Sequence, residues 1–287
     1  KIKLEALNKM LAVREEDRSE IVDLSESLAI TNGITINALC ALSGLELHKN
    51  CITQAKASAD FIRNHLRTTD GGFSPSLILD EYAYVLDGLV SLLQKSWREA
   101  DIAFARKIAD TLIENFYDTE VGGFYMAPRN TEHLIFNPKP TMDETSGPGN
   151  AIASSALNKL GLILGESQFR DAALNTLRWA RTIIEYNPAS HCAFMTSLFE
   201  AARIKYVVVF RGPAEECRKL LMTCHGDIFE SCIFLEIPYG ELKTLPAYLP
   251  KIEPSDAMSI SKAYVFDGTT CSPALHNKDE ILNYLGT

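Results

Sequence analysis

The stretch Gly71-Gly72-Phe73 recurs as Gly122-Gly123-Phe124, 51 residues further along the chain. Each copy follows an amphipathic helical segment and leads through a loop towards another helix. This spacing suits one helical hairpin with its return, and a repeat on that scale indicates an array of helix pairs. In an α/α toroid, the loops that end such pairs gather around one mouth, where a ligand would bind. We therefore expect an α/α toroid with any site at its mouth.

Residues 1–205 are predicted to be helical. In 80–94 the apolar positions Val85, Leu89 and Leu92 recur with helical spacing, and 99–117 shows the same rhythm. Turn residues such as Gly147-Pro148-Gly149 separate the helices. The remaining predicted helices, which bring the total to about eight, cover 4–14, 28–46, 51–67, 149–164, 167–186 and 189–204.

The period with which apolar residues recur changes after Lys205. Short β-branched and aromatic runs at 206–210, 233–237 and 263–266 predict strands, and 214–223 has helical spacing. Residues 238–256 contain several prolines and are expected to form an irregular connection. The fold class is therefore mainly α, with an α/α toroid portion over 1–205 and a small α/β subdomain over 206–287 packed on it.

Composition excludes several classes of function. The chain has 28 Lys and Arg against 37 Asp and Glu, a net charge of −9, and no basic stripe, so we expect neither nucleic acid nor a membrane as partner. No apolar run approaches the roughly 18 residues that a membrane span needs. No phosphate-binding or dinucleotide-binding glycine motif is present, and we expect no cofactor.

The seven cysteines are odd in number and widely spaced, without a CxxC pair. This pattern favours reduced thiols in an intracellular, cytoplasmic protein over a disulfide framework. Cys224-His225-Gly226 is similar to the zinc-binding Cys-His-Gly of lanthionine cyclases, but no third ligand stands at a suitable spacing. We predict no metal site.

The first candidate site is Asp80-Glu81-Tyr82, at the start of a predicted helix. Asp80, Tyr84 and Asp87 stand at i, i+4 and i+7 and share one helical face. Carboxylates lining a pocket are available for acid/base catalysis or for hydrogen bonds to sugar hydroxyls. The alternative is that acidic residues in the first turn stabilise the positive end of the helix dipole.

The second candidate is the polar loop over 137–150, which contains Lys139, Asp143, Glu144 and Asn150. A long ordered loop before a helix is often functional, although it can also serve only to start that helix. If the two acidic pairs, Asp80/Glu81 and Asp143/Glu144, meet at the toroid mouth, they form the facing carboxylates that glycoside hydrolysis uses.

These segments, in this order, resemble the YyaL-type or spermatogenesis-associated protein 20 family over nearly the whole chain. The matching residues are Asn32-Gly33, Asp80-Glu81-Tyr82-Ala83, Asp87-Gly88-Leu89, Gly122-Gly123-Phe124-Tyr125, Pro138-Lys139, Asp143, Gly149-Asn150 and Ala263-Tyr264-Val265. The resemblance implies a six-hairpin glycosidase-like toroid preceded by a thioredoxin-like domain, and it implies that the toroid is incomplete here, because about eight helices are predicted where the family fold would have roughly twelve. We therefore expect this chain to be the C-terminal part of a longer protein, or to be completed by a partner chain.

Several positions depart from the family pattern. Thr31 stands where the family has a tryptophan, Glu144 replaces a glycine, and Phe266 replaces the first cysteine of a pair that would include Cys271. These changes favour a non-catalytic binding or scaffold role.

The alternative is a carbohydrate-active or related small-molecule enzyme, similar to epimerases and glycosidases, whose ligand would be a sugar or another small molecule. Its acid/base candidates are Asp80, Glu81, Asp143 and Glu144. Its substrate-positioning candidates are Asn32, Tyr82, Lys139 and Asn150.

Overall fold

The computed structural model describes residues 25–43, 50–65, 78–132, 134–224, 231–238, 261–268 and 270–286. Several predicted features lie outside these ranges, namely the helix over 4–14, the first glycine repeat at Gly71-Gly72-Phe73, His225 and Gly226, and most of the connection over 238–256. None of the helices within these ranges has the length and apolar character needed to cross a membrane.

Seven helices form the larger part of the described chain. They are α2 (Ser25–Leu42), α3 (Cys51–His65), α4 (Leu79–Lys95), α5 (Glu99–Thr111), α6 (Gly149–Leu164), α7 (Ser167–Tyr186) and α8 (Cys192–Arg203). A π-helical turn, Leu112–Phe116, continues α5, and a short 3-10 turn, Pro188–Ser190, precedes α8. All seven agree with the predicted helices to within a few residues, apart from the late start of α8 and the π-helical end of α5.

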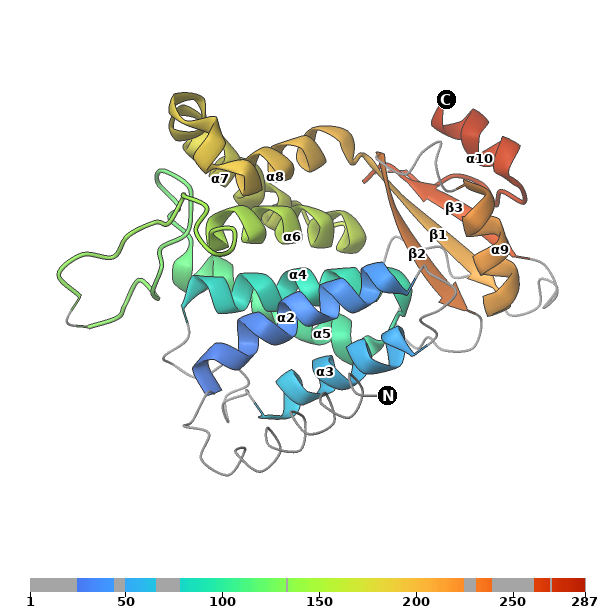
Figure 1. The fold of residues 1–287 in the computed structure, drawn as a ribbon. Coiled ribbons are helices and arrows are strands. Elements are labelled where there is room, and N and C mark those ends of the chain that lie inside the picture. Colours follow the sequence, from blue (N-terminus) through green and yellow to red (C-terminus); the bar gives the residue numbers. More distant parts are fainter. Residues whose placement is uncertain are drawn as a thin grey trace, which may run out of the picture.

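The helices lie in two layers. α4 lies between α2 and α6, and α8 packs on α6 and α7, so that α2, α4, α6 and α8 form one row (Figure 1). α3, α5 and α7 each return along the outside of that row and pack on a member of it. This alternation of inner and outer helices is consistent with part of an α/α toroid.

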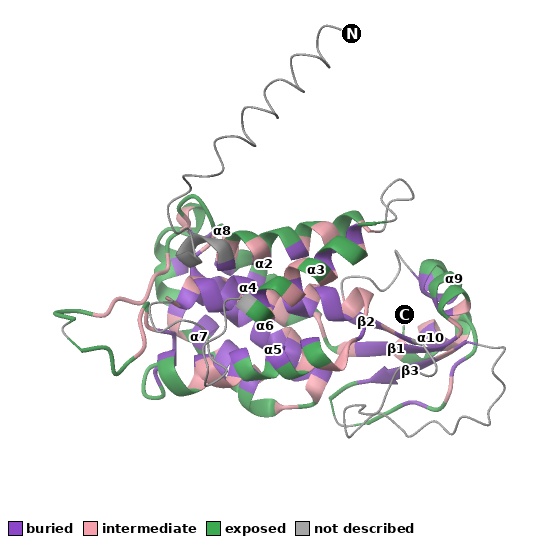
Figure 2. Cartoon of the chain, turned by 90° about the horizontal axis from the view of Figure 1, so that it is seen from below, coloured by how far each residue is buried: buried purple, intermediate pink, exposed green. Residues whose placement is uncertain are grey.

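The central helix α4 is buried over most of its length, which Figure 2 shows in purple. α2 crosses it closely, because a Cβ added to Gly33 would lie 2.3 Å from the carbonyl oxygen of Tyr84, and one added to Gly88 would lie 2.6 Å from the carbonyl oxygen of Gly33. Glycine is therefore required at both positions for the two backbones to approach.

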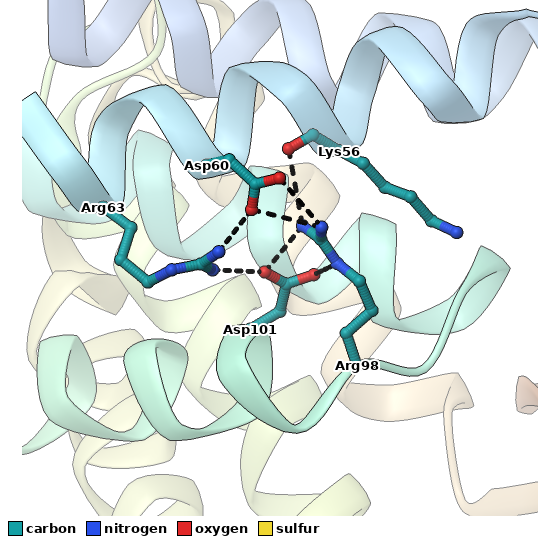
Figure 3. A network of polar contacts seen from close by, with 5 residues as sticks. All are labelled: Lys56, Asp60, Arg63, Arg98 and Asp101. Carbon is teal, nitrogen blue, oxygen red and sulfur yellow. Dashed lines mark hydrogen bonds and ion pairs between the residues drawn. The ribbon is translucent and has the colours of Figure 1, made fainter. Parts of the chain in front are cut away.

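A network of ion pairs joins the outer helices α3 and α5 (Figure 3). Asp101, whose side chain is fully buried, accepts hydrogen bonds from Arg63 at 2.8 Å and from Arg98 at 2.6 and 2.9 Å. Asp60 of α3 pairs with the same two arginines. Two guanidinium groups thus neutralise two carboxylates where the helices meet.

A three-stranded sheet follows the helices, as predicted. Its strands are β1 (Tyr206–Gly212), β2 (Cys232–Pro238) and β3 (Lys262–Phe266), in the order β2-β1-β3. β1 pairs with β2 in parallel and with β3 antiparallel. The helix α9 (Ala214–Cys224) connects β1 towards β2, and α10 (Lys278–Leu285), which the sequence analysis missed, ends the described chain.

The two faces of the sheet have different neighbours. Val207 and Val209 of β1 and Leu235 of β2 belong to the same apolar cluster as the residues of α4 and α6. Val208 and Phe210 point to the opposite face and pack with residues of α9. The predicted fold class, mainly helical with a small C-terminal α/β part, is confirmed. The division into domains at residues 205 and 206 stays a prediction.

Candidate functional site

The inner helices α4, α6 and α8 have their N-termini on the same side of the row. The loop over 143–149 lies between their first turns. Asp80, in the first turn of α4, accepts a hydrogen bond from the backbone N–H of Gly149 at the start of α6, at 2.9 Å. A Cβ on Gly149 would lie 2.3 Å from the same carboxylate oxygen. Glycine at this position therefore lets Asp80 cap the neighbouring inner helix.

Tyr84, one turn further along α4, faces the same loop. Its hydroxyl donates to the carbonyl oxygen of Gly147 at 2.9 Å. Burial raises the pKa of Asp80, the hydrogen bond from Gly149 lowers it, and the nearby charge of Glu144 raises it further. The structure thus brings Asp80, Tyr84 and Glu144 into one local environment, with the Glu144 side chain exposed to solvent.

Asp143 is held at the start of α8. Its two carboxylate oxygens lie 3.2 and 3.3 Å from the backbone N–H of Ala193, and its own N–H donates to the carbonyl oxygen of Ser190 at 2.9 Å. An acidic acceptor at a helix N-terminus satisfies an N–H group that has no partner within the helix and complements the helix dipole. Asp143 therefore caps α8 as Asp80 caps α6.

Glu81 and Tyr82, which follow Asp80 directly in α4, have contacts of their own. The buried Glu81 carboxylate accepts from the backbone N–H of Ile78 at 2.7 Å, which closes the first turn of its own helix. Tyr82 is buried with its ring 5.2 Å from that of Phe116. Glu81 thus makes the contact that the helix-start interpretation expects, and Tyr82 packs in the apolar core.

Lys139 is enclosed by its own loop. Its ammonium nitrogen lies 2.6 Å from a carboxylate oxygen of Asp118 and 2.8 Å from the carbonyl oxygen of Gly122. The rings of Tyr125 and Trp179 lie 4.7 and 5.2 Å from the same nitrogen. This enclosure fastens the turn that carries the second glycine repeat, and Lys139 is not aimed at Asp80.

The contact between Lys139 and Asp118 lowers the pKa of Asp118. Burial alone would raise that pKa, but hydrogen bonds from Lys139, Tyr125 and two backbone N–H groups outweigh burial and hold it well below its usual range. Asp118 therefore stays ionised and keeps its partner Lys139 in place.

Asn150 also has a structural task. Its buried side-chain amide accepts from the N–H of Phe124 at 2.7 Å, and donates to the carbonyl oxygens of Phe124 and Pro140 at 2.9 and 3.0 Å. Asn32 is half-buried on α2, beside the glycine that contacts α4. Of the predicted positioning residues, Asn150 directly follows Gly149, whose N–H donates to Asp80, and Lys139 pairs with Asp118.

A second polar group lies deeper on the inner row, and sequence reasoning found only one of its members. Asn37 of α2 donates to Asp87 of α4, Lys159 of α6 pairs with Glu200 of α8 at 2.7 Å, and Ser155 donates to the same glutamate. Each of these five side chains is half-buried. They come from four helices. Only Asp87 could therefore be linked to Asp80 and Tyr84 from its spacing along one helix.

The charge of Asp87 depends on this surrounding group. Burial raises the pKa of Asp87, while Lys159 and the hydrogen bond from Asn37 lower it and Glu200 raises it. Asp80, Tyr84 and Asp87 thus form a polar stripe along α4. Chemically, this stripe offers hydrogen-bonding groups and carboxylates that burial makes easier to protonate.

Within the described ranges, no three His, Cys, Asp or Glu side chains are grouped closely enough to hold a metal ion. The glutamate and lysine of the deeper group, Glu200 and Lys159, already neutralise one another.

Comparison with known proteins follows the same segments. No family model matches the chain. Spermatogenesis-associated protein 20 of mouse, of rat and of human is 20% identical over an alignment of 301 positions, gaps included, that covers 97% of this chain. The chain spans 38% of the length of these relatives. The comparison confirms that nearly the whole chain is similar to one part of the spermatogenesis-associated protein 20 family.

Proposed function

We propose that this chain is a non-catalytic binding or scaffold part of a protein related to spermatogenesis-associated protein 20. The observation that carries the proposal is the outer face of α8, where Met195 and Phe199 are 47% and 52% exposed. At the other end of the inner row, Ile34 and Leu42 of α2 are 44% and 41% exposed. Apolar side chains gathered on one surface mark a site of contact with other protein segments.

The arrangement of the row explains why these two faces are open. α4 has an inner neighbour on either side, whereas α2 and α8 each have one among the described residues. We propose that further helical hairpins continue the row towards a toroid, supplied by an upstream region that includes a thioredoxin-like domain or by a partner chain. The α2 face suits a preceding segment, and the α8 face suits a partner chain.

The contacts of the predicted catalytic residues support a non-catalytic role. Asp80, Glu81 and Asp143 each accept a hydrogen bond from a backbone N–H at the start of an inner helix. A carboxylate in such a contact stabilises the helix and has one oxygen fewer for a substrate. Lys139 is enclosed by groups of its own loop in the same way.

One observation favours the alternative, a carbohydrate-active or related small-molecule enzyme. A general acid needs a raised pKa, and burial together with the charge of Glu144 raises the pKa of Asp80. In that case Asp80 would donate the proton, and the exposed Glu144 would act as base or stabilise positive charge. The ligand would be a sugar or another polyhydroxylated molecule bound along the α4 stripe.

The free thiols bear on the compartment. All seven cysteines are unpaired, and Cys192 and Cys271 are exposed. Exposed free thiols persist in a reducing environment. We therefore propose an intracellular, cytoplasmic location.

A thermal-shift experiment separates the two functions. The protein and its Asp80→Asn and Glu144→Gln variants would be melted with millimolar glucose, N-acetylglucosamine, N-acetylmannosamine or maltose. The binding role predicts no sugar-dependent rise in melting temperature. A rise in the parent that either variant abolishes would show that a sugar binds at these carboxylates and would favour the enzyme alternative instead.

The apolar faces need a second measurement. The fluorescence of the dye ANS should increase on binding the parent, and should increase less with a Met195→Ser/Phe199→Ser variant, because the dye binds exposed apolar surface. The matched control is Met222→Ser, which changes a residue 56% exposed on α9, away from the row. Equal fluorescence for all three proteins would contradict a binding surface on α8.

A further inference from the structure

A loop between the π-helical turn and α6 carries a second uncovered apolar feature. Leu134, Ile135 and Phe136 are 48%, 105% and 76% exposed. Figure 1 shows this loop, in green, reaching away from the helices. We call residues 127–138, apart from His133, the arm, and these three residues its tip.

The base of the arm is closed by hydrogen bonds. Met126 donates its backbone N–H to the carbonyl oxygen of Pro138 at 2.7 Å. The side chain of Asn137 accepts from the N–H of Ala127 at 3.0 Å and donates to its carbonyl oxygen at 2.8 Å. The two ends of the arm are therefore held together as if they were neighbouring strands.

Arg129 fixes the arm to the helical layer. Its backbone N–H donates to the carbonyl oxygen of Asn115 at 2.8 Å, and its guanidinium donates to that of Glu114 at 2.7 Å. A loop held in this way presents its tip in a set position. Because less conformational freedom is lost on contact, such a tip is suited to docking.

The same chain carries an apolar face of matching character on α8. Met195 and Phe199 lie there, with the guanidinium of Arg203 4.7 Å from the Phe199 ring. The arm, in contrast, has the exposed acidic residue Glu132 beside its tip. The arm and the face thus both carry exposed apolar groups, and each has a charged residue of the sign opposite to the other's.

The arm and the start of α8 lie at the same end of the molecule. The loop that follows the arm reaches Asp143, which caps α8 at Ala193. Two copies that meet through this end would each place an arm beside the α8 of the other. Such reciprocal contacts are what a two-fold dimer requires.

We infer that the tip of one copy, Leu134, Ile135 and Phe136, docks on the Met195 and Phe199 face of α8 in a second copy, and the reverse. This inference rests on the proposed binding role and names the occupant of the α8 face. The net charge of −9 disfavours the other occupant of such a tip, an anionic membrane. Two small contacts of this kind give a weak dimer that dissociates on dilution.

Sedimentation equilibrium of the purified protein between 1 and 100 μM, as roughly set by the affinity of small interfaces, tests the inference. The parent should be a dimer at the upper end of this range. Ile135→Asp/Phe136→Asp in the arm, or Phe199→Asp on α8, should each raise the dissociation constant at least about tenfold. Met222→Asp, an equally exposed apolar position on α9, should leave it unchanged.

Mixing the arm variant with the α8 variant is the decisive step. A dimer of either variant alone lacks both reciprocal contacts. The mixed dimer has one intact arm on one intact face, so association should be partly restored. A monomeric parent, a dimer that the arm variant does not weaken, or a mixture that does not associate would overturn the inference. All variants should melt at the parent temperature, because the altered side chains are exposed.

These outcomes are separate from those that test the proposed function. A parent that is monomeric at 100 μM but binds ANS at α8 would keep the binding role and remove only the arm contact. A sugar-dependent rise in melting temperature would remove the binding role whatever the oligomeric state. Binding of the parent to phosphatidylserine vesicles, lost in the arm variant, would assign the tip to a membrane and overturn the dimer contact.

Discussion

At the scale of single residues, the crossing of α2 over α4 depends on Gly33 and Gly88, whose side chains are single hydrogen atoms. Gly88→Ala would place a methyl carbon 2.6 Å from the carbonyl oxygen of Gly33, a backbone atom that cannot rotate away. We expect a loss of about 1–3 kcal/mol in the free energy of unfolding, measured by urea denaturation. Ala41→Ser, at an exposed position of α2, is the control and should be neutral. An unchanged midpoint for Gly88→Ala would contradict the close crossing.

Asp80 gives a prediction on pH. Its pKa in the folded protein lies above its ordinary value of 3.8, so the folded state binds more protons than the unfolded state between those two values. Stability contributed by this group therefore falls as pH rises through that window. Asp80→Asn keeps an oxygen for the N–H of Gly149 and removes the buried charge. We expect the variant to be at least as stable as the parent at pH 7.

The test compares urea denaturation of the parent, Asp80→Asn and Asp80→Ala at several pH values. The difference between the parent and Asp80→Asn should shrink as pH falls below 3.8, where the parent carboxyl is protonated in both states. Asp80→Ala removes the acceptor at the start of α6 and should be destabilised at every pH. A marked loss of stability in Asp80→Asn at pH 7 would show that the charge itself holds Gly149.

At the scale of elements, Asn150 ties the first turn of α6 to the turn that carries the second glycine repeat. Asn150→Ala leaves the buried N–H and carbonyl of Phe124 without their side-chain partners. Because unsatisfied buried polar groups are costly, we expect a loss of about 2–4 kcal/mol in unfolding free energy. Asn175→Ala, at an exposed position on α7, is the matched control. A loss no larger than that of the control would mean that water replaces the amide.

The ion-pair network between α3 and α5 gives a graded prediction. Asp101→Ala leaves two partly buried arginines facing each other, and we expect a loss of about 3–5 kcal/mol in unfolding free energy. Asp60, whose side chain is 40% exposed, is the internal control, and Asp60→Ala should cost no more than about 1 kcal/mol. Equal effects of the two substitutions, measured by thermal unfolding, would contradict the central position of Asp101.

The helices were predictable because their apolar residues recur on one face, as at Val85 and Leu89 of α4. The hydrogen-bond partners of the acidic residues were harder to predict. Asp80 and Asp143 accept from the N–H groups of Gly149 and Ala193, 69 and 50 residues further along the chain, and no local pattern indicates such distant partners. The spacing placed Asp80 and Tyr84 on one face, whereas their contacts were set by the neighbouring hairpin.

The polar group around Glu200 shows the same limit. Lys159 and Glu200 stand on different helices, and each has the spacing of an ordinary solvent-facing residue. Only the packing of α8 on α6 brings them together. The short helix α10 was missed because eight residues near the end of the chain give too brief an apolar pattern.

At the scale of the whole molecule, the sheet and the helices share one apolar cluster. Val209 of β1 and Leu235 of β2 are fully buried within the cluster that contains the core residues of α4. We expect calorimetry to show one cooperative unfolding transition, and Val209→Asp to lower the melting temperature of helices and sheet together. Val121→Asp, at an exposed site, is the control. Two separate transitions would instead support independent domains.

The carboxylate contact between α4 and α6 also has a consequence for how the protein is made. Asp80 leaves the ribosome 69 residues before the N–H of Gly149 that it caps. Since synthesis runs from the N-terminus at about 5–20 residues per second, the acceptor waits several seconds for its donor. α6 and α8 therefore emerge after Asp80 and Asp143, the acidic residues that cap them. This order suits the array to be assembled one hairpin at a time during translation.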